Sequence, residues 1–419
     1  MPSSIADPRV RASKRLGNVR YEIRGELTRR AHELEAQGRP IIKLNIGNPG
    51  LFGFETPEHL RRALAENLAN SDAYCHQRGL PQAREAIAAH QRRRGATGAN
   101  AQQVFVGNGV SELIDLCLRG LLDNGDEVLL PSPDYPLWSA ATVLNDGVPR
   151  YYHCPAQRGH LPDPDEIEAL IGPRTRALVV INPNNPTGAV YPRELLQALV
   201  EVAHRHRLVL LSDEIYDGIV YDGAQFVPLA ALAGDVACVT FGGLSKMYRA
   251  CGWRVGWISM SGAPAVMDEL AHALDLLAAL RLCANVPGQW AIAPALTGPD
   301  SSAPLTAPGG RLHEARRIVM QYCAQSEFLD LAAPRGALYA FPSIRAAALP
   351  EFDDCQFALE LLEHESILIV PGTGFNMDAR NHFRMTLLPP PDQLHAVFAG
   401  IESVLARQVM GGPLQRHVA

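Results

Sequence analysis

The sequence predicts an α/β fold, with a large domain whose mostly parallel sheet is flanked by helices and a smaller α+β domain built from both chain ends. Between residues 100 and 260, short apolar runs alternate with longer segments whose apolar residues recur at helical spacing. Several runs are apolar at consecutive positions, as expected for strands that helices cover on both faces. The runs are residues 104–107, 127–130, 176–181, 208–211, 238–241 and 255–260.

Helical patterns separate these runs, for example at residues 110–122 and 193–206. Strands that alternate with helices in this way are typical of a parallel sheet. A stretch rich in Pro, Gly and Ser at 298–310 then predicts a linker. Beyond it, the pattern changes to that of a smaller domain. The expected elements there are a helix at 312–328, a strand at 337–341, a helix at 356–365, and strands at 367–370 and 382–388.

The stretch before the large domain ends in an apolar run at residues 42–47 and is too short to fold alone. We therefore expect it to pack on the second domain. The predicted division is an N-terminal arm at residues 1–25, a small domain at 26–55 and 305–419, and a large domain at 56–304.

Composition excludes several classes of protein. The chain has 419 residues, 47% of them hydrophobic and 20% charged, which is ordinary for a globular protein. A formal net charge of -6, without a basic stripe, argues against a nucleic-acid binder. No apolar run is long enough to span a membrane. Eight scattered cysteines without a Cys-x-x-Cys pair predict neither a disulfide frame nor a metal site, and favour a cytoplasmic location.

The most informative segment is residues 241–257, where Lys246 follows an apolar strand amid glycines. A lysine that forms a Schiff base needs a low-dielectric setting that favours its neutral amine. Ser245 and Arg254 offer hydroxyl and guanidinium donors for a phosphate beside it. The alternative is a surface lysine in a glycine-rich turn.

Two further strands end in polar residues. Asn185 lies in Asn-Pro-Asn-Asn-Pro at the end of one strand, where open α/β sheets bind ligands, although these are also common turn residues. Asp213 and Tyr216 follow another strand. Asp213 is suited to hold a pyridine nitrogen protonated and Tyr216 to donate to a phenolic oxygen. A helix N-cap is the alternative role for Asp213.

A fourth segment joins a strand to a helix start, so the backbone N–H groups of Val110 and Ser111 are available to bind a phosphate. The same segment invites a dinucleotide-binding interpretation. Glu112 occupies the place of the third glycine, however, and Met377 does so in the Gly372-Thr-Gly374 segment. Both segments therefore fail that fingerprint.

Arg384 lies in a strand that is otherwise largely apolar. A charge in such a strand must be paired if it is buried. A structural carboxylate and a bound anionic ligand are the two candidate partners.

In their order along the chain, Asn185, Asp213, Lys246 and Arg384 resemble the fold-type I pyridoxal-phosphate-dependent aminotransferases of class I/II. The resemblance covers about residues 16–408. Four runs are similar to the bacterial alanine aminotransferase branch in particular, namely residues 45–49, 107–114, 134–138 and 281–287.

The resemblance implies that the large domain binds pyridoxal phosphate. Lys246 would form the Schiff base and move the substrate proton, and Asp213 would pair with the pyridinium nitrogen. The other implied cofactor contacts are Asn185 and Tyr216 to the ring oxygen, Tyr135 on the ring face, and Ser111, Ser245, Arg254 and the Val110 backbone at the phosphate. Tyr74 would reach the phosphate from a neighbouring subunit, which implies a homodimer with shared sites.

For the substrate, the resemblance implies that Arg384 binds the α-carboxylate beside Asn185 and the Gly47 backbone. A side chain at position 47 would block this close approach. Tyr21 and Arg24 lie in an N-terminal run that we expect to close over substrate, with Tyr21 shaping a small pocket and Arg24 available to an acidic side chain. A plain helix start that packs on the small domain is the alternative for this run.

The implied reaction is amino-group transfer between alanine or glutamate and a 2-oxo acid such as 2-oxoglutarate or pyruvate. Another reaction on the same frame, such as that of a carbon–sulfur lyase or a cyclopropane-forming synthase, stays open, as does a valine or aromatic donor. A transcription regulator would need a DNA-binding domain ahead of residue 42, where too few residues stand.

Overall fold

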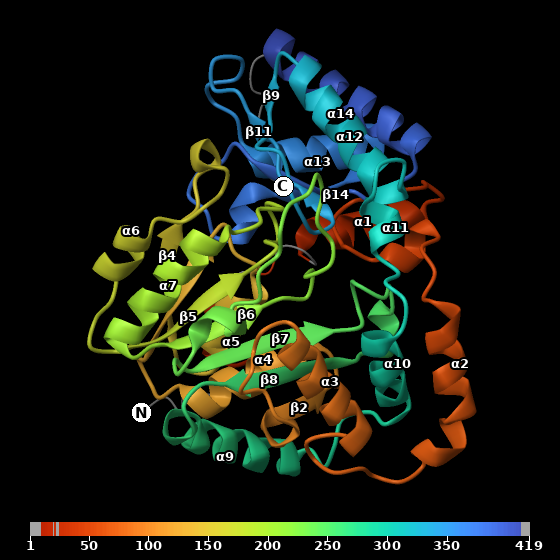
Figure 1. Cartoon of the computed structure of the whole chain (residues 1–419). Coiled ribbons are helices and arrows are strands. Elements are labelled where there is room, and N and C mark those ends of the chain that lie inside the picture. The colour runs from red at the N-terminus through yellow and green to blue at the C-terminus, as the bar shows by residue number, and fades with distance from the viewer. Residues whose placement is uncertain (1–9, 20, 22–24, 412–419) are drawn as a thin grey trace, which may run out of the picture.

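The computed structural model, which describes residues 10–19, 21 and 25–411, contains a central seven-stranded sheet (Figure 1). The strands are β2 (Val104–Gly107), β3 (Glu127–Ser132), β4 (Val148–His153), β5 (Thr175–Ile181), β6 (Val209–Asp213), β7 (Cys238–Gly243) and β8 (Gly256–Ser261). Their spatial order is β2-β8-β7-β6-β5-β3-β4. Neighbouring strands are parallel except around β8, which runs antiparallel to β2 and β7. The mostly parallel sheet predicted from the sequence is confirmed.

Six of these strands match the six apolar runs. The seventh, β4, lies at the sheet edge, and its exposed and covered residues alternate along most of its length. It lacks a run of consecutive apolar residues because only one of its faces is well covered. This is why the sequence did not single it out.

Helices cover both faces of the sheet, and strand β5 shows how. Leu178 and Val180 pack in one apolar cluster with α7 (Arg193–His206), whereas Val179 and Ile181 pack in another with α4 (Val110–Leu121). The remaining flanking helices are α5 (Leu137–Leu144) and α9 (Pro264–Leu280) on the α4 face, and α6 (Pro164–Ala169) and α8 (Ala230–Ala233) on the α7 face. A third cluster joins β2 and β8 to α2 (Glu58–Glu66), α3 (Pro81–Arg93) and α10 (Ile292–Thr297).

A second group of elements, drawn from both ends of the chain, combines helices with short strands. The helices are α1 (Glu26–Ala36), α11 (Ala303–Thr306), α12 (Arg311–Gln325), α13 (Asp354–Glu365) and α14 (Pro391–Gly411). The strands pair as β1 (Ile42–Lys43) with β12 (Ile367–Leu368), β9 (Leu329–Asp330) with β11 (Ser343–Ile344), and β14 (Phe383–Thr386) with both β10 (Tyr339–Ala340) and β13 (Val370–Pro371). One core cluster unites Leu44 with residues of α12, α13 and α14. The N-terminal stretch therefore packs here, as expected.

Two details differ from the sequence prediction. The expected strand at 367–370 is split at Ile369, because β12 pairs with β1 whereas β13 pairs with β14. The expected linker at 298–310 contains the one-turn helix α11. The division into an arm (1–25), a small domain (26–55 and 305–419) and a large domain (56–304) is retained as our proposal.

Across the described residues, no helix combines the length and the apolar character needed to cross a membrane.

Candidate active site

Four neighbouring parallel strands deliver the predicted site residues to one edge of the sheet. Tyr135 follows β3, Asn185 follows β5, Asp213 ends β6, and Lys246 follows β7. The carboxyl ends of parallel strands meet at the same edge, which is where ligands bind in open α/β sheets (Figure 1). The sheet topology therefore gathers residues that lie more than a hundred positions apart in the sequence.

Lys246 is half-buried and points toward the N-terminal segment. Its Nζ donates a hydrogen bond to the Gly47 carbonyl oxygen at 2.5 Å, and Cys251 Sγ lies 3.9 Å away. The interpretation as a surface lysine is therefore wrong. Position 47 has no room for a side chain, since a Cβ there would lie 2.3 Å from the Tyr339 hydroxyl. The observed neighbour is thus Tyr339, which explains why glycine is needed at this position.

Asp213 is buried beneath the same edge. Its Oδ2 accepts a hydrogen bond from Trp138 Nε1 at 3.2 Å, and its Oδ1 accepts one from the Ile215 backbone N–H at 3.3 Å. Burial nevertheless raises the pKa of the Asp213 carboxyl to about 6, although both hydrogen bonds lower it. The N-cap alternative is wrong, because turns follow Asp213 and the next described helix is α8. Asp213 is therefore a buried acid suited to meet a cation.

Arg384 is only 1% exposed and lies beside Asn185. Its Nη1 donates to Asn185 Oδ1 at 2.9 Å, and its Nη2 donates to the Asn45 carbonyl oxygen. The guanidinium lies over the rings of Tyr339 and Phe375, at 4.4 and 4.8 Å from their centroids.

Among the described residues, no carboxylate forms an ion pair with Arg384, and its Nε has no hydrogen-bond partner. The structural-carboxylate interpretation is therefore not realised in the described part of the chain. A buried charge is costly unless an opposite charge accompanies it. Arg384 is thus arranged to receive an anion.

The predicted phosphate contacts lie where β2 leads into α4. The antiparallel pairing of Gly107 with Gly256 brings Arg254 alongside the start of α4. Arg254 Nη2 donates to the Asn108 carbonyl oxygen at 3.3 Å, and a Cβ on Gly109 would lie 2.2 Å from the same nitrogen. Ser111 and Arg254 are exposed, and Ser245 is half-buried.

Two tyrosine pairs complete the local geometry. The Tyr216 hydroxyl lies 2.9 Å from that of Tyr339, and burial raises the pKa of the Tyr216 phenol well above its ordinary value. The Tyr135 hydroxyl lies 3.4 Å from that of Tyr21. Tyr21 therefore approaches the site, whereas Arg24 lies outside the described residues. Tyr74 is 78% exposed on the surface.

Comparison with known proteins gives the family. The family model for aminotransferase class I and II matches residues 39–401.

The chain belongs to the class I and II aminotransferases.

Two curated relatives and one solved structure agree with this assignment. The alanine aminotransferase of Mycobacterium bovis is 47% identical over 378 residues, which are 90% of this chain and 88% of that one. The glutamate-pyruvate aminotransferase AlaA of Escherichia coli is 44% identical over 385 residues, covering 92% and 95% of the two chains. A crystal structure of an aminotransferase from Escherichia coli superposes with a TM-score of 0.92 at 43% identity, covering 96% and 99%.

The resemblance inferred from the motifs is therefore confirmed, and the dinucleotide interpretation is wrong. Aminotransferases of this type use pyridoxal phosphate and transfer amino groups between amino acids and 2-oxo acids. Transamination is accordingly the reaction of this enzyme.

Sequence reasoning missed three residues of the aminotransferase site. Trp138 has an aromatic side chain of the kind that usually only packs, yet its indole N–H donates a hydrogen bond to Asp213. Asn45 contributes its backbone carbonyl to Arg384. Tyr339 appeared as one residue of an apolar strand. Its phenol, a polar group in a fully covered run, was the one available signal, because a buried tyrosine hydroxyl usually finds a partner.

A cavity of about 300 Å³ lies apart from these residues, since neither Lys246 nor Arg384 lines it. Arg94 bridges two of its acids, with Nη1 2.8 Å from Asp217 Oδ2 and Nη2 3.2 Å from Glu214 Oε2. Burial raises the pKa of Glu214 to about 7, and the Arg94 charge opposes that rise. Because these groups satisfy one another, the cluster supports the chain beside Asp213.

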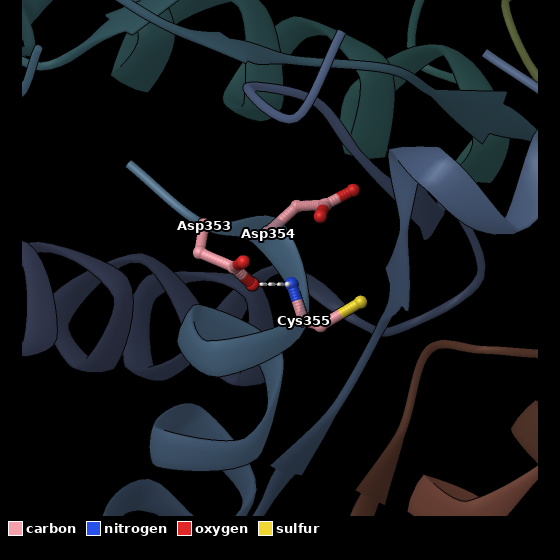
Figure 2. A group of neighbouring side chains, drawn as sticks. All are labelled: Asp353, Asp354 and Cys355. Carbon is pink, nitrogen blue, oxygen red and sulfur yellow. Dashed lines mark hydrogen bonds between the residues drawn. The ribbon is translucent and has the colours of Figure 1, made fainter. Parts of the chain in front are cut away.

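An acidic cluster also lies at the start of α13, where Asp353, Asp354 and Cys355 are neighbours (Figure 2). Asp353 Oδ1 accepts hydrogen bonds from the backbone N–H groups of Cys355 and Gln356. Asp353 Oδ2 lies 2.7 Å from Arg380 Nη1, and Asp354 Oδ2 accepts from the Thr373 N–H at 2.7 Å. These carboxylates therefore cap the helix and its neighbouring turn.

Proposed function

We propose that this aminotransferase moves an amino group between alanine or glutamate and a 2-oxo acid such as pyruvate or 2-oxoglutarate. The observation that carries the proposal is Arg384, a buried guanidinium without a carboxylate partner among the described residues. A substrate α-carboxylate would supply the missing charge and match the planar guanidinium with two parallel hydrogen bonds. The names of the two curated relatives support alanine and glutamate as the donors.

The buried residues also fit pyridoxal phosphate. Asp213 is a buried acid that burial alone disfavours as a carboxylate, and a protonated pyridine nitrogen would reverse this effect. Bound there, the cofactor would supply an electron sink for negative charge at the substrate Cα. We assign Asn185 and Tyr216 to its ring oxygen and Tyr135 to its ring face.

The phosphate would lie at the start of α4, where free backbone N–H groups attract anions. We assign it to the Val110 and Ser111 end of this helix, with Ser245 and Arg254 as further donors. A Cβ on Gly256 would lie 2.6 Å from the Val110 nitrogen, so glycine keeps the two chain segments close.

Three residues then act on the substrate. Arg384 and Asn185 would fix the carboxylate, which orients the Cα–H bond relative to Lys246. The Lys246 amine would link the cofactor to the resting enzyme and, once released, take the proton from Cα. Its contact with the Gly47 carbonyl holds the amine between the cofactor strands and the substrate side.

We further propose a homodimer in which Tyr74 reaches the phosphate of the partner copy. The exposure of its side chain supports this role, because a large aromatic residue on a surface is typical of interfaces.

Tyr21 is assigned to the substrate side-chain pocket. Truncation in a Tyr21→Ala variant removes the contact with Tyr135 and opens the pocket, so KM for alanine should rise about tenfold. Tyr21→Phe keeps the ring, and its KM should stay within about threefold of wild type. Steady-state kinetics of both variants test this, and equal KM values for Tyr21→Ala and wild type would remove Tyr21 from the pocket.

We assign Trp138 the role of stabilising the Asp213 carboxylate through its indole N–H. Without the indole N–H, a Trp138→Phe variant stabilises the Asp213 carboxylate less, so the pKa of Asp213 rises further above about 6. As the pH falls, the variant should therefore lose its affinity for the cofactor earlier than wild type does. The midpoint of this loss should lie up to about one pH unit above that of wild type. Fluorescence titrations of the apoenzyme with pyridoxal phosphate between pH 5 and 8 measure this midpoint. An unchanged midpoint would contradict the assignment.

A half-reaction assay tests the proposed donor. The holoenzyme is mixed separately with alanine, glutamate, valine and phenylalanine, and the cofactor spectrum is followed as the amino group moves to the cofactor. Alanine and glutamate should convert it at rates at least about tenfold above the other two. Faster conversion by valine or phenylalanine would overturn alanine and glutamate as the donors.

A further inference from the structure

Tyr339 contacts both Arg384, which we assign to the substrate, and Tyr216, which we assign to the cofactor. It is 2% exposed and belongs to β10, where it pairs with Thr386 of β14. Thr386 and Arg384 are two positions apart on that strand and so point to the same face. Diagonal neighbours on one face of an antiparallel pair are within reach of an aromatic side chain. The sheet register therefore brings the Tyr339 ring to Arg384.

The Tyr339 ring supports the Arg384 guanidinium from one side. The guanidinium carbon lies 4.4 Å from the ring centroid, which is within the range of a cation–π contact. Asn185 Oδ1 and the Asn45 carbonyl hold the two Nη atoms of Arg384. Ring and acceptors together fix the plane of the guanidinium, and a planar fork binds a carboxylate well only in the right plane.

The Tyr339 hydroxyl makes a separate contact on the cofactor side. It lies 2.9 Å from the Tyr216 hydroxyl, and the two rings meet edge to face at 81°. It also fills the space beside Gly47. Each phenol carries a single proton. If Tyr216 donates its proton to the cofactor ring oxygen, Tyr339 must be the donor within the tyrosine pair.

We propose that Tyr339 is a positioning residue with two separable roles. Its ring orients Arg384 toward the substrate carboxylate, and its hydroxyl donates to Tyr216 and so strengthens the bond from Tyr216 to the cofactor ring oxygen. The inference rests on the proposed function, because it takes Arg384 as the carboxylate receptor and Tyr216 as a cofactor contact. One buried side chain thereby connects the residues that hold the substrate to those that hold the cofactor.

Two variants separate the roles. Tyr339→Phe keeps the ring and loses the hydroxyl, whereas Tyr339→Leu loses both. The role of the hydroxyl is measured by a pH titration of the holoenzyme absorption band that reports protonation of the link to Lys246. The role of the ring is measured by the dissociation constant of propionate, which carries a carboxylate but no amino group. Propionate binding is detected by its effect on the same band.

In Tyr339→Phe, the ring oxygen of the cofactor loses stabilisation of its negative charge and holds the neighbouring proton more firmly. The titration midpoint should move up by about 0.5 to 1 pH unit, the effect of one lost hydrogen bond. Propionate affinity should stay within about twofold. In Tyr339→Leu, propionate affinity should fall by about tenfold or more, since the cation–π contact is lost.

Tyr221→Phe is the matched control, because its hydroxyl is also buried but donates to the Ala337 carbonyl oxygen at 2.9 Å. Neither the midpoint nor propionate binding should change in it. An unshifted midpoint in Tyr339→Phe would overturn the hydroxyl role even if the leucine variant failed to fold. Weakened propionate binding in Tyr339→Phe equal to that in Tyr339→Leu would overturn the role of the ring.

The two proposals fail in distinguishable ways. If the wild-type holoenzyme bound no propionate and did not react with any amino acid, the proposed function would be wrong. If wild type behaved as proposed and the Tyr339 variants matched it, only the role of Tyr339 would be wrong.

Discussion

Lys246→Ala should abolish transamination, with kcat reduced by at least about a thousandfold, because one side chain serves both as the cofactor link and as the base. Cofactor binding should survive in weakened form, since Asp213, Ser245 and Arg254 remain. A donor amino acid added to this variant should stay attached to the cofactor without turnover. Stopped-flow and steady-state measurements on the reconstituted variant test this expectation.

Lys43 provides the control for this substitution. It forms an ion pair with Glu35 at 2.8 Å and takes no part in the site, so Lys43→Ala should keep wild-type kcat. An exposed or half-exposed pair of this kind contributes little stability. Normal turnover by Lys246→Ala would contradict the assignment of the cofactor lysine.

Arg384→Ala should lower kcat/KM by about a hundredfold or more for every amino acid substrate. The lost interaction is a charged, two-pronged bond to the α-carboxylate, which all substrates share. Arg384→Lys should recover only part of the loss, because an ammonium cannot form both bonds in one plane. The resting cofactor spectrum should be unchanged, and kinetics with spectra for both variants test the prediction.

Arg316 is a matched control, since it is also a buried arginine but has structural partners. Its Nη2 lies 2.7 Å from Asp222 Oδ2, and its Nε donates to the Pro334 carbonyl oxygen. Arg316→Ala should lower the melting temperature and leave the kinetics of the folded fraction intact. If Arg384→Ala behaved in the same way, Arg384 would be structural as well.

The fold could be predicted wherever one local pattern was sufficient. Strand β5 is apolar at consecutive positions because both of its faces are covered, and this pattern is visible in the sequence. Strand β4 was not predicted, because an edge strand shows no such run of consecutive apolar residues. The break at Ile369 was not predicted for another reason. It arises because β12 pairs with β1 and β13 pairs with β14, and a local sequence pattern does not show these partners.

The site followed the same rule. The placement of Asn185, Asp213 and Lys246 at one edge of the sheet was predictable, because each stands at the end of an apolar strand and carries a polar side chain. Trp138 and Tyr339 were not, because their roles depend on contacts across 75 and 123 positions of sequence. An aromatic residue in an apolar segment is usually a packing residue. Only the folded arrangement shows which polar atom it meets.

We assign Lys246 as the residue that holds the cofactor, and the composition of the chain makes this assignment easy to test. The sequence contains three lysines, Lys14, Lys43 and Lys246. The holoenzyme is reduced with borohydride, which makes the link permanent, and is then digested and analysed by mass spectrometry. We expect the reduced cofactor on the peptide that contains Lys246 and unmodified peptides for the other two. A cofactor on Lys14 or Lys43, or no modified peptide in a holoenzyme that is active, would contradict the assignment of Lys246.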